Sequence, residues 1–357
     1  MKRHPSTIRP AFTSAVLLFA SAAVVCGFEW EKLDFQNAVA KTQAENRILY
    51  VLFGEKDCGY CKRLETEVLA EATVVDELRD LVAIKIHINS DEGASLSREY
   101  GVWTYPTTIL LNSDIEEIDR IVGYVDVDKY VTRLRDYIAG RNTMSDCISR
   151  LQKNPLDPLL NFQLAEKYID RRLYATAYIY LDQAIEFDPH NHSEIVDDAL
   201  FMKGLHLHTK NKRTDRAIPV LQRVVADFPK SDKAVFAFVW LVRCNGAVND
   251  REAIINAYET YVRKLPVDPR PHRAIVDVLM SHWGADGDAH KVALAAAHKA
   301  VKLDPGDRSH YSLAVVLKNM GDTDNAREAA DTARRLNPKD PRYWQLRTEL
   351  EKGVTNE

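Results

Sequence analysis

The 357-residue sequence has few cysteines, few glycines and prolines, and no large excess of one charge. Five cysteines are too few to hold a fold together with disulfides. Fourteen glycines and fourteen prolines exclude a collagen-like or low-complexity chain. There are 48 Lys and Arg against 52 Asp and Glu, and no basic stretch predicts a nucleic-acid partner. With 46% hydrophobic residues, the chain is globular and long enough for two domains.

The N-terminal residues 1–27 have the pattern of a secretory signal peptide. Three Lys and Arg residues precede an apolar run from Ala11 to Val25, and small residues follow. Two alternatives stay open, namely an uncleaved membrane anchor over 10–28 and lipidation of Cys26. A cleaved signal predicts a periplasmic or secreted protein. The membrane is an expected partner only if this segment is uncleaved or lipidated.

Residues 29–140 alternate between strand-like and helix-like patterns. Apolar runs predict strands at 48–53, 81–89, 107–111 and 120–124. Helical spacing of apolar residues predicts helices over 34–44, 62–78 and 128–138. Strands that alternate with helices predict an α/β sheet.

A Cys-x-x-Cys motif, Cys58-Gly59-Tyr60-Cys61, follows closely on the first predicted strand. A helix N-terminus carries free N–H groups and partial positive charge, which stabilise a thiolate. The thiolate is the nucleophile of disulfide exchange, and two intervening residues keep the second thiol within reach. No second ligand pair completes a zinc site. The motif therefore predicts redox chemistry at Cys58 and Cys61 with no metal and no separate cofactor.

This domain resembles the thioredoxin fold over residues 29–140. The matching pieces are the cysteine motif, Phe53 on the preceding strand, and Tyr105-Pro106-Thr107 before a later strand. The resemblance implies that Cys58 is the exposed attacking sulfur and Cys61 the buried resolving one. It also implies a cis peptide bond at Tyr105-Pro106. The residues it assigns to the substrate groove are Gly59, Tyr60, Tyr105 and Pro106.

Two positions depart from the thioredoxin pattern. The acidic strand residue six positions before the first cysteine is Leu52 here, and Asp57 replaces the tryptophan just before that cysteine. An adjacent carboxylate disfavours a thiolate, whereas Lys56 and Lys62 can offset this effect. These departures leave the rate and direction of exchange open.

Residues 141–357 contain an internal repeat. Six prolines that follow helical apolar patterns lie 33 to 40 residues apart, namely Pro155, Pro189, Pro229, Pro266, Pro305 and Pro338. The segments 158–191 and 307–340 resemble tetratricopeptide repeats, and three looser repeats lie between them. The inter-helix turn of one repeat is expected to be lengthened through 283–288. Residues 340–351 are expected to form a capping helix.

Three other groups of residues carry no predicted chemistry. Cys147 and Cys244 are expected to be small buried residues, and a disulfide between them stays open. His206 and His208 lie two apart on a helix and make a poor metal pair. The acidic residues at 286–288 lack the rest of a calcium loop.

The sequence thus predicts an α/β thioredoxin fold followed by an all-α tetratricopeptide-repeat solenoid of about five repeats. We expect an exported thiol–disulfide oxidoreductase, a reductase or isomerase of protein disulfides. The expected partners are protein clients with thiols or disulfides, bound by the repeats, and a redox partner protein. The alternative is a holdase chaperone or scaffold with little redox activity, because this domain order is similar to that of a bacterial chaperone-type thioredoxin.

Overall fold

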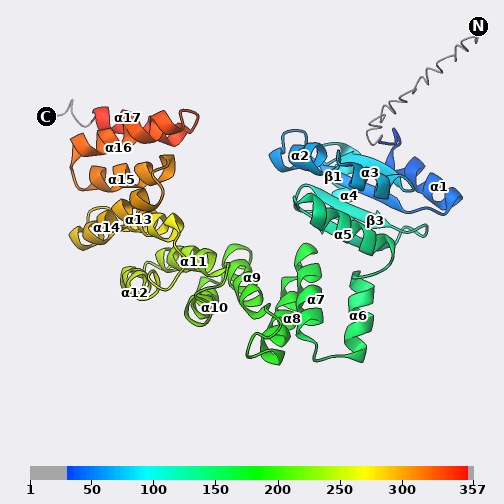
Figure 1. Cartoon of the computed structure of the whole chain (residues 1–357). Helices are drawn as coiled ribbons and strands as arrows, with labels where there is room; N and C mark the ends of the chain where they lie inside the picture. The colour runs from blue at the N-terminus through cyan, green and yellow to red at the C-terminus, as the bar shows by residue number, and fades with distance from the viewer. Residues whose placement is uncertain (1–29, 353–357) are drawn as a thin grey trace, which may run out of the picture. The chain divides into compact units, whose positions relative to one another are not determined.

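The computed structural model describes residues 30–352 (Figure 1), so the predicted signal peptide and Cys26 lie outside the described residues. The chain divides into two compact units between Arg141 and Asn142. Within residues 30–352, no helix combines the length and the apolar character needed to cross a membrane.

The first unit contains a mixed four-stranded sheet, as the sequence predicts. Its strands are β1 (Leu49–Gly54), β2 (Val82–His87), β3 (Thr107–Leu111) and β4 (Glu117–Val122), in the order β2-β1-β3-β4. Strand β1 pairs in parallel with β2 and antiparallel with β3, and β3 pairs antiparallel with β4. Every residue of β1 is buried, as its continuous apolar sequence requires.

Helices cover both faces of this sheet. They are α1 (Phe35–Glu45), α2 (Gly59–Arg63), α3 (Ala72–Leu78), α4 (Asp91–Glu99) and α5 (Val127–Ile138). Residues of α3 and α5 pack on the face that carries Tyr50 and Leu52. Residues of α1 and α4 pack on the face that carries Val51 and Phe53. Successive side chains of β1 point to opposite faces of the sheet and therefore belong to two separate cores.

The prediction of one continuous helix over 62–78 is wrong. A π-helical segment, Leu64–Val68, follows α2 directly, and the chain then leaves the helix at 69–71 before α3 begins. The N–H of Leu69 bonds to the carbonyl of Leu64, five residues earlier, which rotates the later side chains. Leu64, Val68 and Leu69 are all buried as a result. Apolar spacing alone does not reveal such a shift in helical phase.

Two other elements of this unit differ from the sequence-based expectations. Helix α4 was not predicted, because its sequence is polar and only Gly93, Leu96 and Ser97 are buried. An added Cβ at Gly93 would lie 2.0 Å from the His87 carbonyl oxygen, so α4 approaches the end of β2 closely. Strand β4 begins at Glu117 rather than at residue 120.

The second unit is all helical. Helix α6 (Met144–Lys153) precedes five helix pairs and a last helix, α17 (Pro341–Lys352). The pairs are α7 (Pro158–Asp170) with α8 (Tyr174–Phe187), α9 (Val196–Thr209) with α10 (Thr214–Asp227), α11 (Ala234–Ala247) with α12 (Arg251–Tyr261), α13 (Pro269–Trp283) with α14 (Gly287–Leu303), and α15 (Asp307–Asn319) with α16 (Thr323–Leu336). Adjacent pairs stack on one another along the unit (Figure 1).

The lengthened turn expected through 283–288 is wrong. Helix α13 ends at Trp283 and α14 begins at Gly287, so only residues 284–286 connect them. The Asp286 carboxylate accepts hydrogen bonds from the N–H groups of Asp288 and Ala289 and caps α14. The acidic and glycine residues that suggested a long loop are therefore a helix cap and its first turn.

Small residues allow the paired helices to approach closely. An added Cβ at Gly204 in α9 would lie 2.7 Å from the Leu221 Cγ in α10. We expect Gly204→Ala to cost about 1–3 kcal/mol by overpacking and to lower the urea midpoint of the helical circular dichroism signal. Gly287→Ala is the matched control, because no atom lies within 4 Å of its added Cβ. Equal midpoints for the two variants would contradict this packing.

Candidate active site

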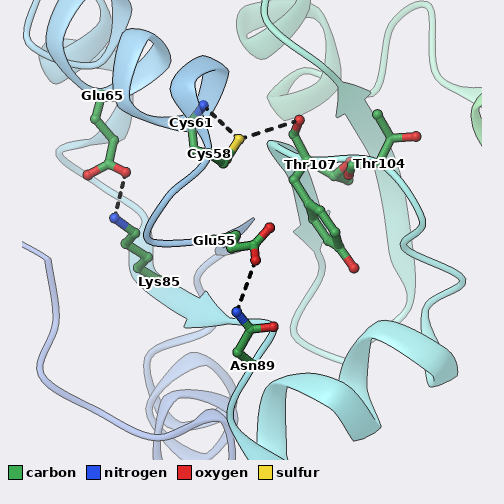
Figure 2. Close-up of a disulfide and its surroundings, with 9 residues drawn as sticks. Glu55, Cys58, Cys61, Glu65, Lys85, Asn89, Thr104 and Thr107 are labelled. Carbon is green, nitrogen blue, oxygen red and sulfur yellow. Dashed lines mark hydrogen bonds and ion pairs between the residues drawn. A yellow bond between two sulfur atoms is a disulfide. The ribbon is translucent and has the colours of Figure 1, made fainter.

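The two cysteines of the motif form a disulfide at the N-terminus of α2 (Figure 2). Cys58 is the N-cap of the helix, and its Cα lies 5.2 Å from that of Cys61. The Cys61 N–H donates a hydrogen bond to the Cys58 Sγ at 3.1 Å. Cys58 is half-buried, whereas Cys61 is only 2% exposed. A reagent from solvent therefore reaches Cys58 and not Cys61.

The loop before β3 lies against the first sulfur. The Tyr105-Pro106 peptide bond is cis, as the resemblance implies. The Tyr105 carbonyl oxygen lies 3.9 Å from the Cys58 Sγ, and the Thr107 hydroxyl donates to the Thr104 carbonyl in the same loop (Figure 2). The structure thus brings Cys58, Cys61, Tyr105 and Pro106 together. Their catalytic and substrate-binding roles stay predictions.

Gly59 and Tyr60 lie on the outer side of the disulfide. Apart from its chain neighbours and its own helix, no part of the protein comes within 4 Å of an added Cβ at Gly59, so the turn is open at this point. The Tyr60 side chain is 61% exposed, and its ring centroid lies 6.4 Å from that of Tyr124. Tyr60 therefore presents an aromatic surface to solvent next to Cys58.

An ion-pair cluster supports the Tyr124 ring beside Tyr60. The Arg63 guanidinium lies 4.3 Å from the centroid of the Tyr124 ring and 2.9 Å from the Glu67 carboxylate. The Tyr124 hydroxyl donates to the same carboxylate at 2.8 Å. Hydrogen bonds from Arg63 and then Tyr124 lower the pKa of Glu67. The sequence patterns missed Tyr124, although the i,i+4 spacing of Arg63 and Glu67 signals their pairing.

A second charge pair joins β2 to the π-helical segment that follows α2. The Lys85 Nζ is 2.5 Å from the Glu65 Oε1, and both side chains are partly buried (Figure 2). The β1–β2 register places Lys85 opposite Leu52, which occupies the position where thioredoxins carry an acid. The sequence patterns missed this pair too. Its signal is a lysine between the apolar residues Ile84 and Ile86 and a glutamate four residues after Cys61.

Three other charged side chains next to the motif are in water. Asp57, Lys56 and Lys62 are all exposed. Solvent and salt screen exposed charges, so their effect on the Cys58 sulfur is weaker than their closeness in sequence suggests.

Cys147 and Cys244 are buried, and neither is disulfide-bonded. The disulfide between them that the sequence leaves open is therefore not formed. Burial raises the pKa of the Cys244 thiol to about 12. A thiol with so high a pKa is protonated at neutral pH and is a poor nucleophile.

Comparisons with known proteins agree with these two units. The family model of a thioredoxin-like domain matches residues 35–138. Tetratricopeptide-repeat models match residues 198–231 and 307–340. Residues 35–138 therefore belong to the thioredoxin-like family, and tetratricopeptide repeats follow them, as the sequence predicts.

Solved structures resemble each part of the chain. A putative disulphide-isomerase from Bacteroides thetaiotaomicron is 31% identical over 31% of this chain and 93% of that one, with a TM-score of 0.29. A thioredoxin from Thermus thermophilus is 28% identical over 31% of this chain and 86% of that one, also with a TM-score of 0.29. The tetratricopeptide-repeat protein YrrB is 14% identical over 58% of this chain and 97% of that one, with a TM-score of 0.43.

The fold and the cysteine pair define a class of protein. A thioredoxin-like fold with a close cysteine pair suggests a thiol–disulfide oxidoreductase. Tetratricopeptide repeats suggest protein–protein interaction in general.

The exposure of Cys58 and the burial of Cys147 and Cys244 predict how fast each thiol reacts. After reduction of the disulfide at pH 8, iodoacetamide should modify Cys58 quickly and should modify Cys147 and Cys244 only in denaturant, because those two thiols are buried. Peptide mass spectrometry after short labelling times measures each site separately. Rapid labelling of Cys244 in the folded protein would contradict the burial described here.

Proposed function

We propose that this protein is an exported thiol–disulfide oxidoreductase, a reductase or isomerase of protein disulfides. The observation that carries the proposal is the unequal exposure of the two sulfurs at the helix N-terminus. Cys58 is half-buried beside the Tyr105 carbonyl, and Cys61 is almost wholly buried. Export rests on the signal-peptide pattern in residues 1–27, and the proposed location is the periplasm or the medium.

The proposed reaction has two exchange steps. In the first, the Cys58 thiolate attacks one sulfur of a client disulfide, forms a mixed disulfide and releases a client thiolate. In the second, the Cys61 thiolate attacks the Cys58 sulfur, forms the Cys58–Cys61 disulfide and releases the other client thiolate. Two electrons pass from the protein to the client. A dithiol of a redox partner protein returns them, and the relative reduction potentials decide the direction.

The local geometry favours ionisation of Cys58 over Cys61. The Cys61 N–H already points at the Cys58 Sγ, and a hydrogen bond to an anion is stronger than one to a neutral group. The start of the helix adds partial positive charge at the same atom. Cys61 lies in the protein interior, where desolvation disfavours a thiolate until the mixed disulfide has formed.

The surroundings of Cys58 fit a peptide substrate. The Tyr105 carbonyl is a hydrogen-bond acceptor for a client main chain that approaches the sulfur. Tyr60 adds an exposed aromatic ring on the outer side of the disulfide. The repeats are proposed to bind the client or another partner.

Substitution of each cysteine separates the two steps. We expect Cys58→Ser to lose the reduction of insulin to the uncatalysed background, because it lacks the attacking thiolate. Cys61→Ala should form mixed disulfides that persist on a non-reducing gel, because nothing resolves them. Cys244→Ala, which removes a buried thiol of the repeat unit, is the control and should keep its activity.

Cys58→Ser and a variant with both motif cysteines changed to serine test the holdase alternative. Full insulin reduction by Cys58→Ser would exclude the proposed chemistry. The protein would belong to the holdase class instead if the wild type suppressed aggregation without redox activity. Suppression should then be unchanged when both motif cysteines are serine.

The exposed ring of Tyr60 provides a test of client docking. Tyr60→Ala should raise KM for a protein disulfide about three- to tenfold, because aromatic contact area is lost at the docking surface. The rate with a small disulfide such as oxidised glutathione should stay near that of the wild type. An equal loss with both substrates would mean that Tyr60 acts on the cysteines rather than on the client.

A further inference from the structure

Four helices of the repeat unit line a groove with an unusual charge. The groove has a volume of about 730 Å³ and is formed by α11, α13, α15 and α17. Its lining includes five arginines and one carboxylate, that of Asp277. The whole chain has a net charge of −4, so this concentration of positive charge does not follow from composition.

Three of the arginines occupy the same position in alternate helices. Arg270, Arg308 and Arg342 are the second residues of α13, α15 and α17. In a solenoid, equivalent positions of successive repeats form a row along one face. In α7, α9 and α11 the second residues are Leu159, Asp197 and Val235. The arginine row is therefore confined to the C-terminal part of the unit.

The arginines differ in how their charge is balanced. Arg270 and Arg342 each bind an aspartate two residues earlier, at 2.7 Å and 2.6 Å. Arg273 lies 3.0 Å from Asp304. Among the residues that the structure describes, no carboxylate forms an ion pair with Arg243 or Arg308. Two guanidinium groups of the groove are thus available to an external carboxylate.

Aromatic rings form the walls between these charges. The Arg243 guanidinium lies 5.0 Å from the centroid of the Trp240 ring, and that of Arg270 lies 4.3 Å from the Phe236 ring. Attraction to the ring faces restricts the movement of both guanidinium groups. The rings also offer apolar surface to a ligand between the charged positions.

The carboxyl group of Asp277 also lines this groove, and it accepts a hydrogen bond from Ser312. Neighbouring side chains keep part of the solvent away from the carboxyl, and this desolvation raises its pKa. The positive charges of Arg243 and Arg273 oppose that rise. The arginines would attract an anionic ligand, whereas the carboxylate of Asp277 would repel it.

We propose that the groove lined by α11, α13, α15 and α17 binds an extended acidic segment of a partner protein. Carboxylates of the segment pair with Arg243 and Arg308, and apolar side chains contact Trp240 and Tyr311. Charge complementarity carries this assignment, because five guanidiniums and one carboxylate line the groove. The inference rests on the proposed role of the repeats in protein binding but not on the redox chemistry.

Peptides that differ only in charge test this proposal on the full chain. The probe is a short fluorescein-labelled peptide of glutamate, glycine and phenylalanine, measured by fluorescence anisotropy. We expect at least about tenfold weaker binding when its glutamates are glutamines, and weaker binding still when they are lysines. Arg243→Gln combined with Arg308→Gln should weaken binding of the glutamate peptide about tenfold or more.

A substitution of Asp277 should have the opposite effect on peptide affinity. Asp277→Asn should tighten the glutamate peptide severalfold, because it removes a repelling charge. Arg223→Gln is the matched control, since Arg223 is an exposed arginine of α10 outside the groove, and it should leave Kd unchanged. Circular dichroism confirms that the variants fold.

Three results would overturn the proposal. They are equal Kd values for the glutamate and glutamine peptides, wild-type binding by the Arg243→Gln and Arg308→Gln double variant, or tighter binding of a short oligonucleotide of equal charge. Failure here is separable from failure of the redox proposal. The variant with both motif cysteines changed to serine should bind the peptide as the wild type does, and the arginine double variant should still reduce a small disulfide.

Discussion

The complete burial of β1 between two layers of helices fixes the position of the cysteine pair. Because every side chain of β1 is packed, the strand has one register with β2 and one with β3. The pairing of Phe53 with Thr107 places the end of β1 next to the start of β3. The turn that carries Cys58 and the loop that carries Tyr105 therefore meet, although 47 residues separate them. The site depends on this register more than on contacts of its own.

Much of the first unit could be predicted because its signals are local. The apolar run of β1, the cysteine motif after it and the apolar face of α5 all lie within short stretches of sequence. The π-helical segment after α2 could not be predicted, since it alters the phase of the helix without altering the apolar composition. The pairing of Lys85 with Glu65 depends on which strands are neighbours, which spacing along the chain does not specify.

In the repeat unit, the sequence revealed the period but not the exact helix starts. The proline spacing was enough to predict helix pairs of the right number. The sequence does not show that Asp286 caps a helix, because that role depends on its hydrogen bonds to the N–H groups of Asp288 and Ala289. The row of Arg270, Arg308 and Arg342 becomes visible only when each helix start is known, because the three residues share a position counted from that start.

The fixed guanidinium groups of the groove have a consequence for the time course of binding. Arg243, one of the two arginines proposed to bind the ligand, lies against the Trp240 ring, and the neighbouring Arg270 and Arg342 are paired with Asp268 and Asp340. Side chains that are already ordered lose little rotamer entropy when a ligand arrives. Association then needs little rearrangement, so partners of different sequence should arrive at similar rates. They would differ in residence time, and the groove would select partners by how long they stay.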